Sequence, residues 1–213
     1  MRNVFLQYRT LCQDRHYLYY LMTGGILLIT SFVVIHYAGL YATRMAGSSV
    51  SDLFLDHLPL WDVNVLHIHA ALIFWLVFVI YLLMQPQWLP FVTKTAAVFI
   101  LVRSVFICMT HLGPPENLLS IPPHLASYIL FDGDLFFSGH VGGPCLMLMI
   151  FWRHMLLRII CLCATVFFSL TVLLGHIHYS IDVFSAPFIT FGLYQFCYHQ
   201  FTTERSYCQQ GVL

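Results

Sequence analysis

Leu156–Asp182 reads LLRIICLCATVFFSLTVLLGHIHYSID, an apolar run that passes directly into a short polar cluster. The part from Leu156 to Leu174 has close to the ~20 apolar residues that a helix needs to cross a bilayer. His178 and Asp182 follow soon after it, four positions apart. If this stretch is helical, that spacing places the imidazole and the carboxylate on one face. The stretch therefore predicts a membrane-spanning helix with a polar site at its end.

Five other apolar runs predict further spans. Their approximate bounds are Leu18–Tyr37, Val65–Met84, Phe91–Thr110, His140–Trp152 and Ile181–Tyr198. We therefore expect one all-α integral membrane domain over residues 1–213, with six transmembrane helices. The catalytic segments are expected within residues 100–185. The pairs Gly24-Gly25 and Gly142-Gly143 predict close packing between helices.

The composition agrees with a membrane protein. Hydrophobic residues make up 60% of the chain and charged residues only 8%, against about 25% charged in an average soluble domain. The formal net charge is zero, so nothing in the sequence suggests nucleic acid as a partner. The first apolar run is too long for a removable signal peptide, and no small-residue cleavage site follows it.

The charged residues predict the orientation of the spans. With six spans, seven of the nine basic residues fall on one side, namely Arg2, Arg9, Arg15, Lys94, Arg153, Arg158 and Arg205. The other side carries Asp52, Asp56, Asp62, Glu116, Asp132 and Asp134. Because basic residues are enriched in cytoplasmic loops, both termini are expected to be cytoplasmic. The loops at 38–64, 111–138 and 175–180 would then face the lumen, periplasm or exterior.

A second polar motif, Ser138-Gly139-His140, lies 38 residues before His178. With the predicted topology it opens the fourth span at the same membrane interface as His178 and Asp182. Two histidines and a carboxylate are the minimum equipment for covalent phosphoryl transfer, in which one imidazole attacks and the other moves protons. Ser138 and Gly139, just before a helix, would offer a capping hydroxyl and backbone N–H groups for phosphate oxygens. A site at headgroup level implies a lipid substrate.

Four stretches resemble the sphingomyelin synthase family, within the type 2 phosphatidic acid phosphatase superfamily. Gly133–His140 (GDLFFSGH) and His176–Val183 (HIHYSIDV) resemble two signatures of that family, and together they are highly specific. Arg103–Pro115 (RSVFICMTHLGPP) resembles the segment that leads out of its third span. Ser51–Asp56 (SDLFLD) is a weaker match, because the family's prolines are missing.

The resemblance implies a role for each matching residue. His178 would be the nucleophile, Asp182 its orienting partner, and His140 the acid and then the base. The implied cycle transfers phosphocholine or a similar headgroup from a membrane phospholipid to ceramide or a diacylglycerol-like lipid. No cofactor and no metal are expected, because the site has imidazoles and N–H donors but no carboxylate cluster suited to magnesium. Oligomeric state stays open, and a homodimer is among the partners considered.

Two departures favour a transferase over a hydrolase. Phosphatases of the superfamily usually carry an arginine six residues before the nucleophile, where this chain has Val172. The phosphatase-type lysine and Arg-Pro pair is also absent, because Ser104 follows Arg103. With water in place of the acceptor, the same residues would give a lipid phosphatase or a phospholipase C-type hydrolase.

The remaining candidate residues are assigned to substrate binding. They are Arg103, Asp134, Ser138, Gly139, His176 and Tyr179. An arginine inside an apolar span is costly, so Arg103 is interpreted as a phosphate clamp. The alternative is that it snorkels to the interface or pairs with a carboxylate on the outer side. His176 contacts phosphate or lies at a wet helix end, and Asp134 is more typical of an orienting residue.

A third function class is a non-enzymatic, histidine-rich membrane protein that binds haem or metal. His57, His67 and His69 supply enough ligands for such a site. However, alternating histidines point in different directions on a helix, and no Cys-x-x-Cys or His-x-x-x-His pattern accompanies them. They are therefore interpreted as interfacial residues, although His69 lies where it could border the active site.

Overall fold

A computed structural model describes residues 4–115 and 135–210, which contain helices and no strand. The helices are α1 (Val4–Leu11), α2 (Arg15–Met45), α3 (Asn64–Leu83), α4 (Leu89–Met109), α5 (Gly139–Ile150), α6 (Met155–Leu174), α7 (Ser180–Gln200) and α8 (Thr202–Gln210). Two 3₁₀ turns, η1 (Leu55–His57) and η2 (Pro86–Trp88), lie between them. The predicted all-α class is thus confirmed over the described residues.

Four segments of the described chain are long and apolar enough to cross a membrane. They are Arg15–Met45, Val65–Leu83, Pro86–Met109 and Met155–Leu174. The predicted fourth and sixth spans correspond to α5 and α7, which fall outside this group. With 12 residues, α5 is about 18 Å long, against about 30 Å for a hydrocarbon core. The count of six membrane crossings therefore remains a prediction.

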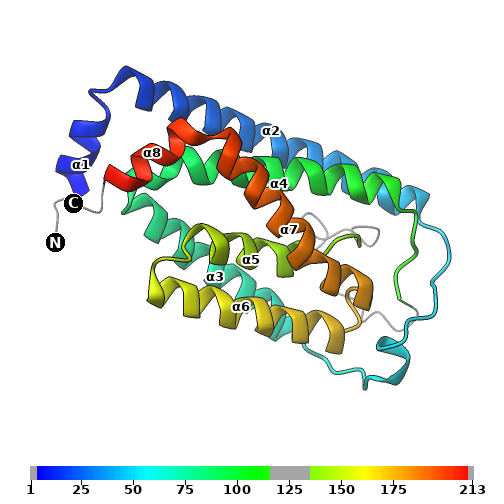
Figure 1. Cartoon of the computed structure of the whole chain (residues 1–213). Helices are drawn as coiled ribbons and strands as arrows, with labels where there is room; N and C mark the ends of the chain where they lie inside the picture. Colours follow the sequence, from blue (N-terminus) through cyan, green and yellow to red (C-terminus); the bar gives the residue numbers. More distant parts are fainter. Residues whose placement is uncertain (1–3, 116–134, 211–213) are drawn as a thin grey trace.

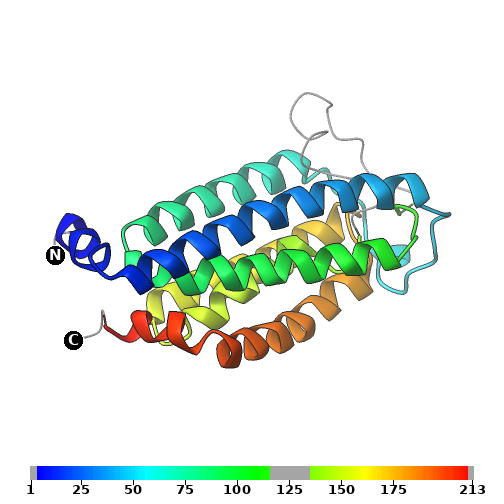
Figure 2. The same cartoon turned by 90° about the horizontal axis from the view of Figure 1, so that it is seen from above.

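Helices α2, α3, α4, α6 and α7 run along the length of an elongated bundle, and the shorter α5 lies among them (Figure 1, Figure 2). Both termini lie at one end, beside α1 and α8. The loops that follow α2 and α6 lie at the other, which we call the loop end. Within the bundle α2 packs along α4, and α5 packs against α6 and α7.

Helix α5 lies at the centre of the core. Nine of its twelve residues are buried, among them Val141 and Leu146. Close packing there depends on glycine, as the sequence predicts. A Cβ atom at Gly142 would lie 2.7 Å from the Phe99 ring, and one at Gly143 would lie 2.7 Å from the Trp75 ring. By contrast, large apolar side chains of α2, α3 and α6 cover the outside of the bundle, as expected for a surface that faces lipid.

Backbone hydrogen bonds tie the loops together at the loop end. The Gly47 N–H donates to His111 O at 3.0 Å, and the Gly113 N–H donates to Ser48 O at 3.2 Å. A Cβ atom at Gly113 would lie 2.3 Å from Gly47 O, so the two loops approach closely only because residue 113 is glycine. The Trp61 N–H donates to Leu174 O at 2.9 Å and fixes the chain before α3 to the end of α6.

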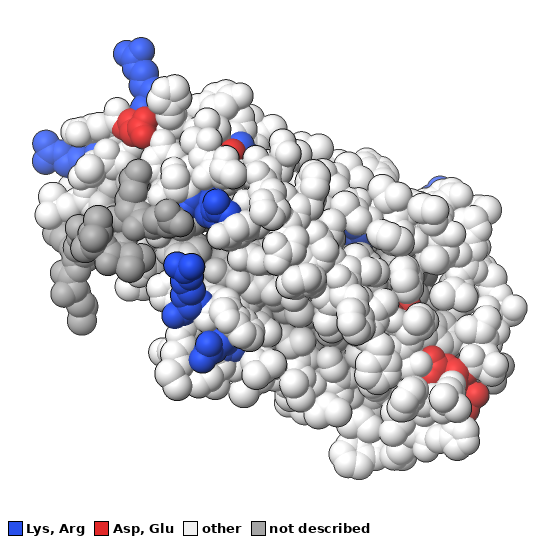
Figure 3. Space-filling view, in the orientation of Figure 1, with Lys and Arg blue, Asp and Glu red and all other residues white. Residues whose placement is uncertain are grey.

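The charges separate between the two ends of the bundle (Figure 3). Blue Lys and Arg side chains gather mainly at the end with the termini, where some red is also visible, and the other red Asp and Glu side chains lie at the loop end. This is the segregation that the sequence predicts for the two sides of a membrane. Which side each end faces remains a prediction.

Candidate active site

The two polar motifs meet at the loop end of the core. Ser138 precedes α5 and Asp182 lies in the first turn of α7, and the Ser138 N–H donates to Asp182 O at 3.1 Å. This bond places the start of α5 beside the start of α7. The ring centroids of His140 and His178 lie 6.3 Å apart as a result.

His178 and Asp182 form a buried pair. Nδ1 of His178 lies 3.5 Å from Oδ2 of Asp182, and both side chains are almost fully buried. The carboxylate is held in place because Oδ2 also accepts the Tyr179 N–H at 3.0 Å. Since the carboxylate lies beside Nδ1, a nucleophilic His178 would attack through Nε2. A carboxylate in this position orients the ring and stabilises a positive charge on it.

Arg103 on α4 reaches this site instead of snorkelling to the surface. It is buried, and its Nε–H donates to Phe137 O at 2.8 Å. Its guanidinium lies against Gly139, where a Cβ atom would be 3.0 Å from Nε and 3.1 Å from Cζ. Arg103 thus brings a permanent positive charge to the start of α5, one residue from His140.

The start of α5 differs in one respect from the sequence prediction. Ser138 is the residue before the helix, but its side chain makes no capping hydrogen bond. The hydroxyl is buried and has no hydrogen-bond partner in the described part of the chain. The predicted capping hydroxyl is therefore wrong. The first N–H groups of a helix have no acceptor within the helix, and this helix start lies beside the Arg103 guanidinium.

Tyr179 and His176 occupy different positions at the loop end. The Tyr179 hydroxyl donates to Gly113 O at 2.9 Å and accepts the Val50 N–H at 3.1 Å, so it holds the two loops together. His176 is buried with a φ of 50°, and its Nε2 has no partner among residues 4–115 and 135–210. Asp134 lies outside the described residues.

Two cavities are lined by residues predicted to bind substrate, although His140, His178 and Asp182 line neither of them. An apolar groove of about 670 Å³ lies between α2, α3, α4 and α5, and its lining includes Arg103 and Gly139. A polar pocket of about 400 Å³ lies at the loop end and is lined by Asp52, His176 and Tyr179, among others. The apolar groove would suit a lipid tail, and the polar pocket would suit a polar headgroup.

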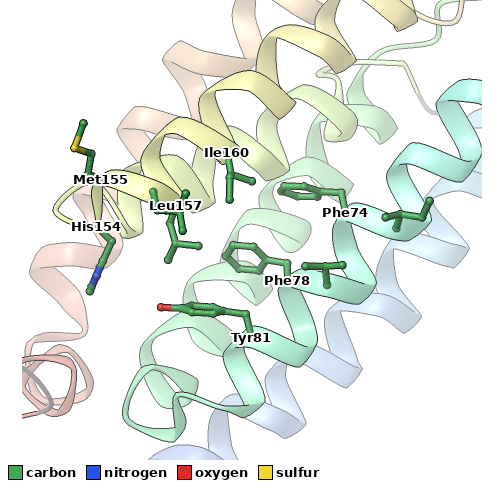
Figure 4. Close-up of a pocket in the computed structure, with 10 residues that line it drawn as sticks. Phe74, Phe78, Tyr81, His154, Met155, Leu157 and Ile160 are labelled. Carbon is green, nitrogen blue, oxygen red and sulfur yellow. The ribbon is translucent and has the colours of Figure 1, made fainter. Parts of the chain in front are cut away.

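A third cavity lies away from the site (Figure 4). This groove of about 630 Å³ separates α3 from the start of α6. Phe74, Phe78 and Leu157 project toward it, with His154 and Tyr81 nearer the end with the termini. None of the predicted site residues lines it.

Sequence reasoning missed two residues that contact the site. His67 is buried on α3 with its ring centroid 4.5 Å from that of His140, whereas His69 is exposed and bonds to its own helix. Asp52 accepts the N–H and the hydroxyl of Ser180 and so holds the first residue of α7. The weak motif around Asp52 was the only sequence signal for it. The signal for His67 is its spacing from the core side chains Phe74 and Phe78, which follow it by seven and eleven residues. Residues at these spacings share one face of a helix, so His67 lies on the buried face of α3.

In the described part of the chain, no group of three or more His, Cys, Asp or Glu side chains is arranged to hold a metal ion.

The fold and the site define a helical membrane protein with two histidines, a carboxylate and an arginine at one end of its core. Residues 133–200 match a family model described as PAP2 superfamily C-terminal, and this segment includes His140, His178 and Asp182. This segment is thus similar to the C-terminal part of the type 2 phosphatidic acid phosphatase superfamily, whose members are generally enzymes that act on phosphate esters. The match does not extend to the sphingomyelin synthase family. No curated protein and no solved structure matches the chain.

Proposed function

We propose that the protein is a lipid phosphotransferase that moves a phospho-headgroup from a membrane phospholipid to ceramide or a related alcohol. The observation that carries this proposal is the arrangement of three side chains. Asp182 lies 3.5 Å from Nδ1 of His178, and the His140 ring lies 6.3 Å from the His178 ring. One imidazole is thus set up to attack and the other to exchange protons around the same phosphorus.

The proposed reaction has two half-reactions. In the first, Nε2 of His178 attacks phosphorus, and the bond from phosphorus to the diacylglycerol oxygen breaks as His140 protonates that oxygen. The phosphohistidine is cationic on its ring, and the Asp182 carboxylate stabilises it. In the second, His140 removes the proton of the acceptor hydroxyl, whose oxygen attacks phosphorus and releases His178. Protons and bonds balance over the cycle.

Arg103 supports the charge that develops on the phosphoryl oxygens. Its buried guanidinium lies against Gly139, at the start of α5, where helix N–H groups also favour an anion. This position makes it the best candidate for a phosphate clamp. Phosphatases of the superfamily usually have an arginine at the position of Val172. In this chain Arg103 would supply the positive charge near the nucleophile instead.

The apolar groove supports a lipid as the substrate. Its lining is almost entirely aliphatic and aromatic, including Phe32, Val92, Ile100 and Leu146, and Arg103 stands among these residues as a charged group. A molecule with acyl chains and a phosphate would place its tails in the groove and its phosphate beside Arg103. The proposed active site faces the lumen, periplasm or exterior, at the end opposite the termini.

A hydrolase is the second candidate, and the polar pocket favours it. The pocket of about 400 Å³ at the loop end includes His176, two residues before the proposed nucleophile. Water that entered through this pocket would take the place of the lipid acceptor and give a lipid phosphatase or a phospholipase C-type activity.

The test uses the purified chain in lipid nanodiscs with headgroup-labelled phosphatidylcholine, with and without ceramide. The proposal predicts a labelled sphingolipid that forms only when ceramide is present. Free labelled phosphocholine at the same rate with or without ceramide would establish the hydrolase instead. A protein with His178→Ala controls for contaminating lipases, because it should form neither product.

A further inference from the structure

His67 is a third histidine in contact with the proposed catalytic pair. It is 2% exposed, and its ring contacts those of His140 at 4.5 Å and Phe168 at 5.6 Å between centroids. It comes from α3, which lies outside the matched family segment at residues 133–200. Nothing in the reaction proposed above uses it.

The hydrogen bonds around His67 determine where its proton lies. Oγ1 of Thr171 lies 2.9 Å from Nδ1 of His67 and 3.2 Å from the carbonyl oxygen of Phe168. A carbonyl only accepts, and a hydroxyl has one proton to give. Both contacts are satisfied together when Thr171 donates to Phe168 O and accepts the Nδ1–H of His67. Nε2 of His67 is then an acceptor with a free lone pair.

Two buried nitrogens near this contact lack partners. Nε2 of His67 and Nδ1 of His140 are both buried and make no hydrogen bond within the described residues. Burying a polar group without a partner is costly, so these two atoms on adjoining rings are candidates to be hydrogen-bond partners of each other. The charged or titratable side chains that also face His140 are His178 and Arg103.

We propose that His67 is a positioning residue for His140, accepting the His140 Nδ1–H on its own Nε2. This inference rests on the proposed function, because it assigns His140 the role of acid and base. The bond would hold the proton of His140 on its Nδ1. The lone pair on Nε2 of His140 would then be directed at the substrate oxygens. The chain Phe168–Thr171–His67–His140 then orients the second histidine as Asp182 orients the first.

The two orienting groups differ in charge, and the difference suits the two roles. A carboxylate stabilises the cationic ring of a phosphohistidine on His178. A neutral imidazole acceptor stabilises protonated His140 less than a carboxylate would. His140 is therefore the better suited of the two histidines to give its proton to the leaving oxygen and to take one from the acceptor hydroxyl in turn.

The test compares His67→Phe with His67→Gln. Phenylalanine keeps an aromatic ring in the core but accepts no hydrogen bond, whereas the glutamine carbonyl replaces Nε2 as acceptor. We expect kcat to fall about 10- to 100-fold in His67→Phe with KM nearly unchanged, as when the outer partner of a functional histidine is lost. His67→Gln should recover most of that loss. His69→Ala is the matched control, because His69 is exposed on the same helix.

A second measurement does not depend on turnover. Nitrogen NMR of histidine-labelled protein should show His140 protonated on Nδ1 in the wild type and a changed tautomer in His67→Phe. Equal kcat in the wild type and His67→Phe, or an unchanged His140 tautomer, would overturn the inference. A wild type that acts on no lipid would refute the proposed function separately. If His67 variants do not fold, Thr171→Val provides the same tests, since it removes the acceptor for Nδ1 at nearly constant volume.

Discussion

Asp52 holds the first residue of α7 from a loop that lies 128 positions earlier in the chain. Its Oδ2 accepts the Ser180 N–H at 2.7 Å and the Ser180 hydroxyl at 2.8 Å, while Oδ1 accepts N–H groups of Phe54 and Leu55. Burial raises the pKa of the Asp52 carboxyl, but these hydrogen bonds outweigh burial and leave the pKa below its ordinary value of 3.8. Asp52 therefore stabilises the helix start that carries Asp182.

We predict that Asp52→Asn destabilises the protein at neutral pH but not in acid. A carboxyl whose pKa is lowered by folding adds stability above its unfolded pKa, and this stability is lost as the pH falls through the folded pKa. The expected loss at pH 7 is about 1 kcal/mol, as for removal of a helix cap. Thermal melts of both proteins should differ at pH 7 and converge below pH 3.8. A gap of equal size at both pH values would contradict this account.

The residues at the site were predictable from the sequence to different extents. The spacing of His178 and Asp182 predicts a shared helix face, but α7 begins at Ser180 and only Asp182 lies in it. The proximity of the two residues still follows from the sequence, because they are only four positions apart. The burial of Arg103 against Gly139 does not, since it depends on a contact between α4 and α5. The sequence does not predict the contact between His67 and the site, because alternating histidines diverge on a helix. The divergence is real, but it buries His67 and exposes His69.

At the scale of elements, α5 shows why glycine is needed in the core. The Cβ position of Gly142 lies 2.7 Å from Phe99 and 3.0 Å from Oγ1 of Thr190, so α4 and α7 both close on this helix. The helix begins at the site and has little room to shift. Its position therefore determines where His140 lies.

We predict that Gly142→Ala lowers stability by about 1–3 kcal/mol, the usual cost of overpacking a core. It should also lower activity, because His140 lies two residues away. Gly25→Ala on α2 is the matched control, since no atom lies within 4 Å of its Cβ position. The control should be as stable as the wild type or slightly more so. Equal melting temperatures for the two variants would argue against tight packing around α5.

The groove between α2 and α5 gives a prediction about substrate binding. Ala96→Phe should fill part of the groove and raise the KM for a lipid substrate about 10-fold, since its acyl chains lose apolar contact. The matched control is Ile160→Phe, which adds an aromatic ring to the separate groove between α3 and α6. That variant should keep the wild-type KM. If Ile160→Phe raised KM and Ala96→Phe did not, the substrate groove would be assigned wrongly.

The periodicity of the sequence predicts the positions of the helices well, but it does not predict which of them cross the membrane. The predicted span Leu156–Leu174 matches α6 (Met155–Leu174), and Val65–Met84 matches α3 (Asn64–Leu83). The run from His140 to Trp152 became the short helix α5, which begins beside the site and is buried on nearly all sides. Apolar composition does not distinguish a lipid-facing helix from one enclosed by its neighbours.

At the scale of the whole molecule, the separation of charge predicts the topology. Basic side chains gather mainly at the end with the termini, while Asp52, Asp56 and Asp62 belong to the loop end (Figure 3). In sealed vesicles an impermeant maleimide should label Cys12 and an introduced Leu53→Cys from opposite sides of the membrane. Both positions are exposed. Labelling of the two from the same side would contradict six crossings with both termini cytoplasmic.

The central claim is that His178 carries the phospho-headgroup during transfer. Its most direct test is to incubate the protein with headgroup-labelled phosphatidylcholine in the absence of an acceptor, quench at alkaline pH and map the labelled peptide by mass spectrometry. We predict an acid-labile adduct on His178 that is absent from His178→Ala and disappears when ceramide is added. An adduct that persists in His178→Ala, or that maps to another residue, would contradict the account.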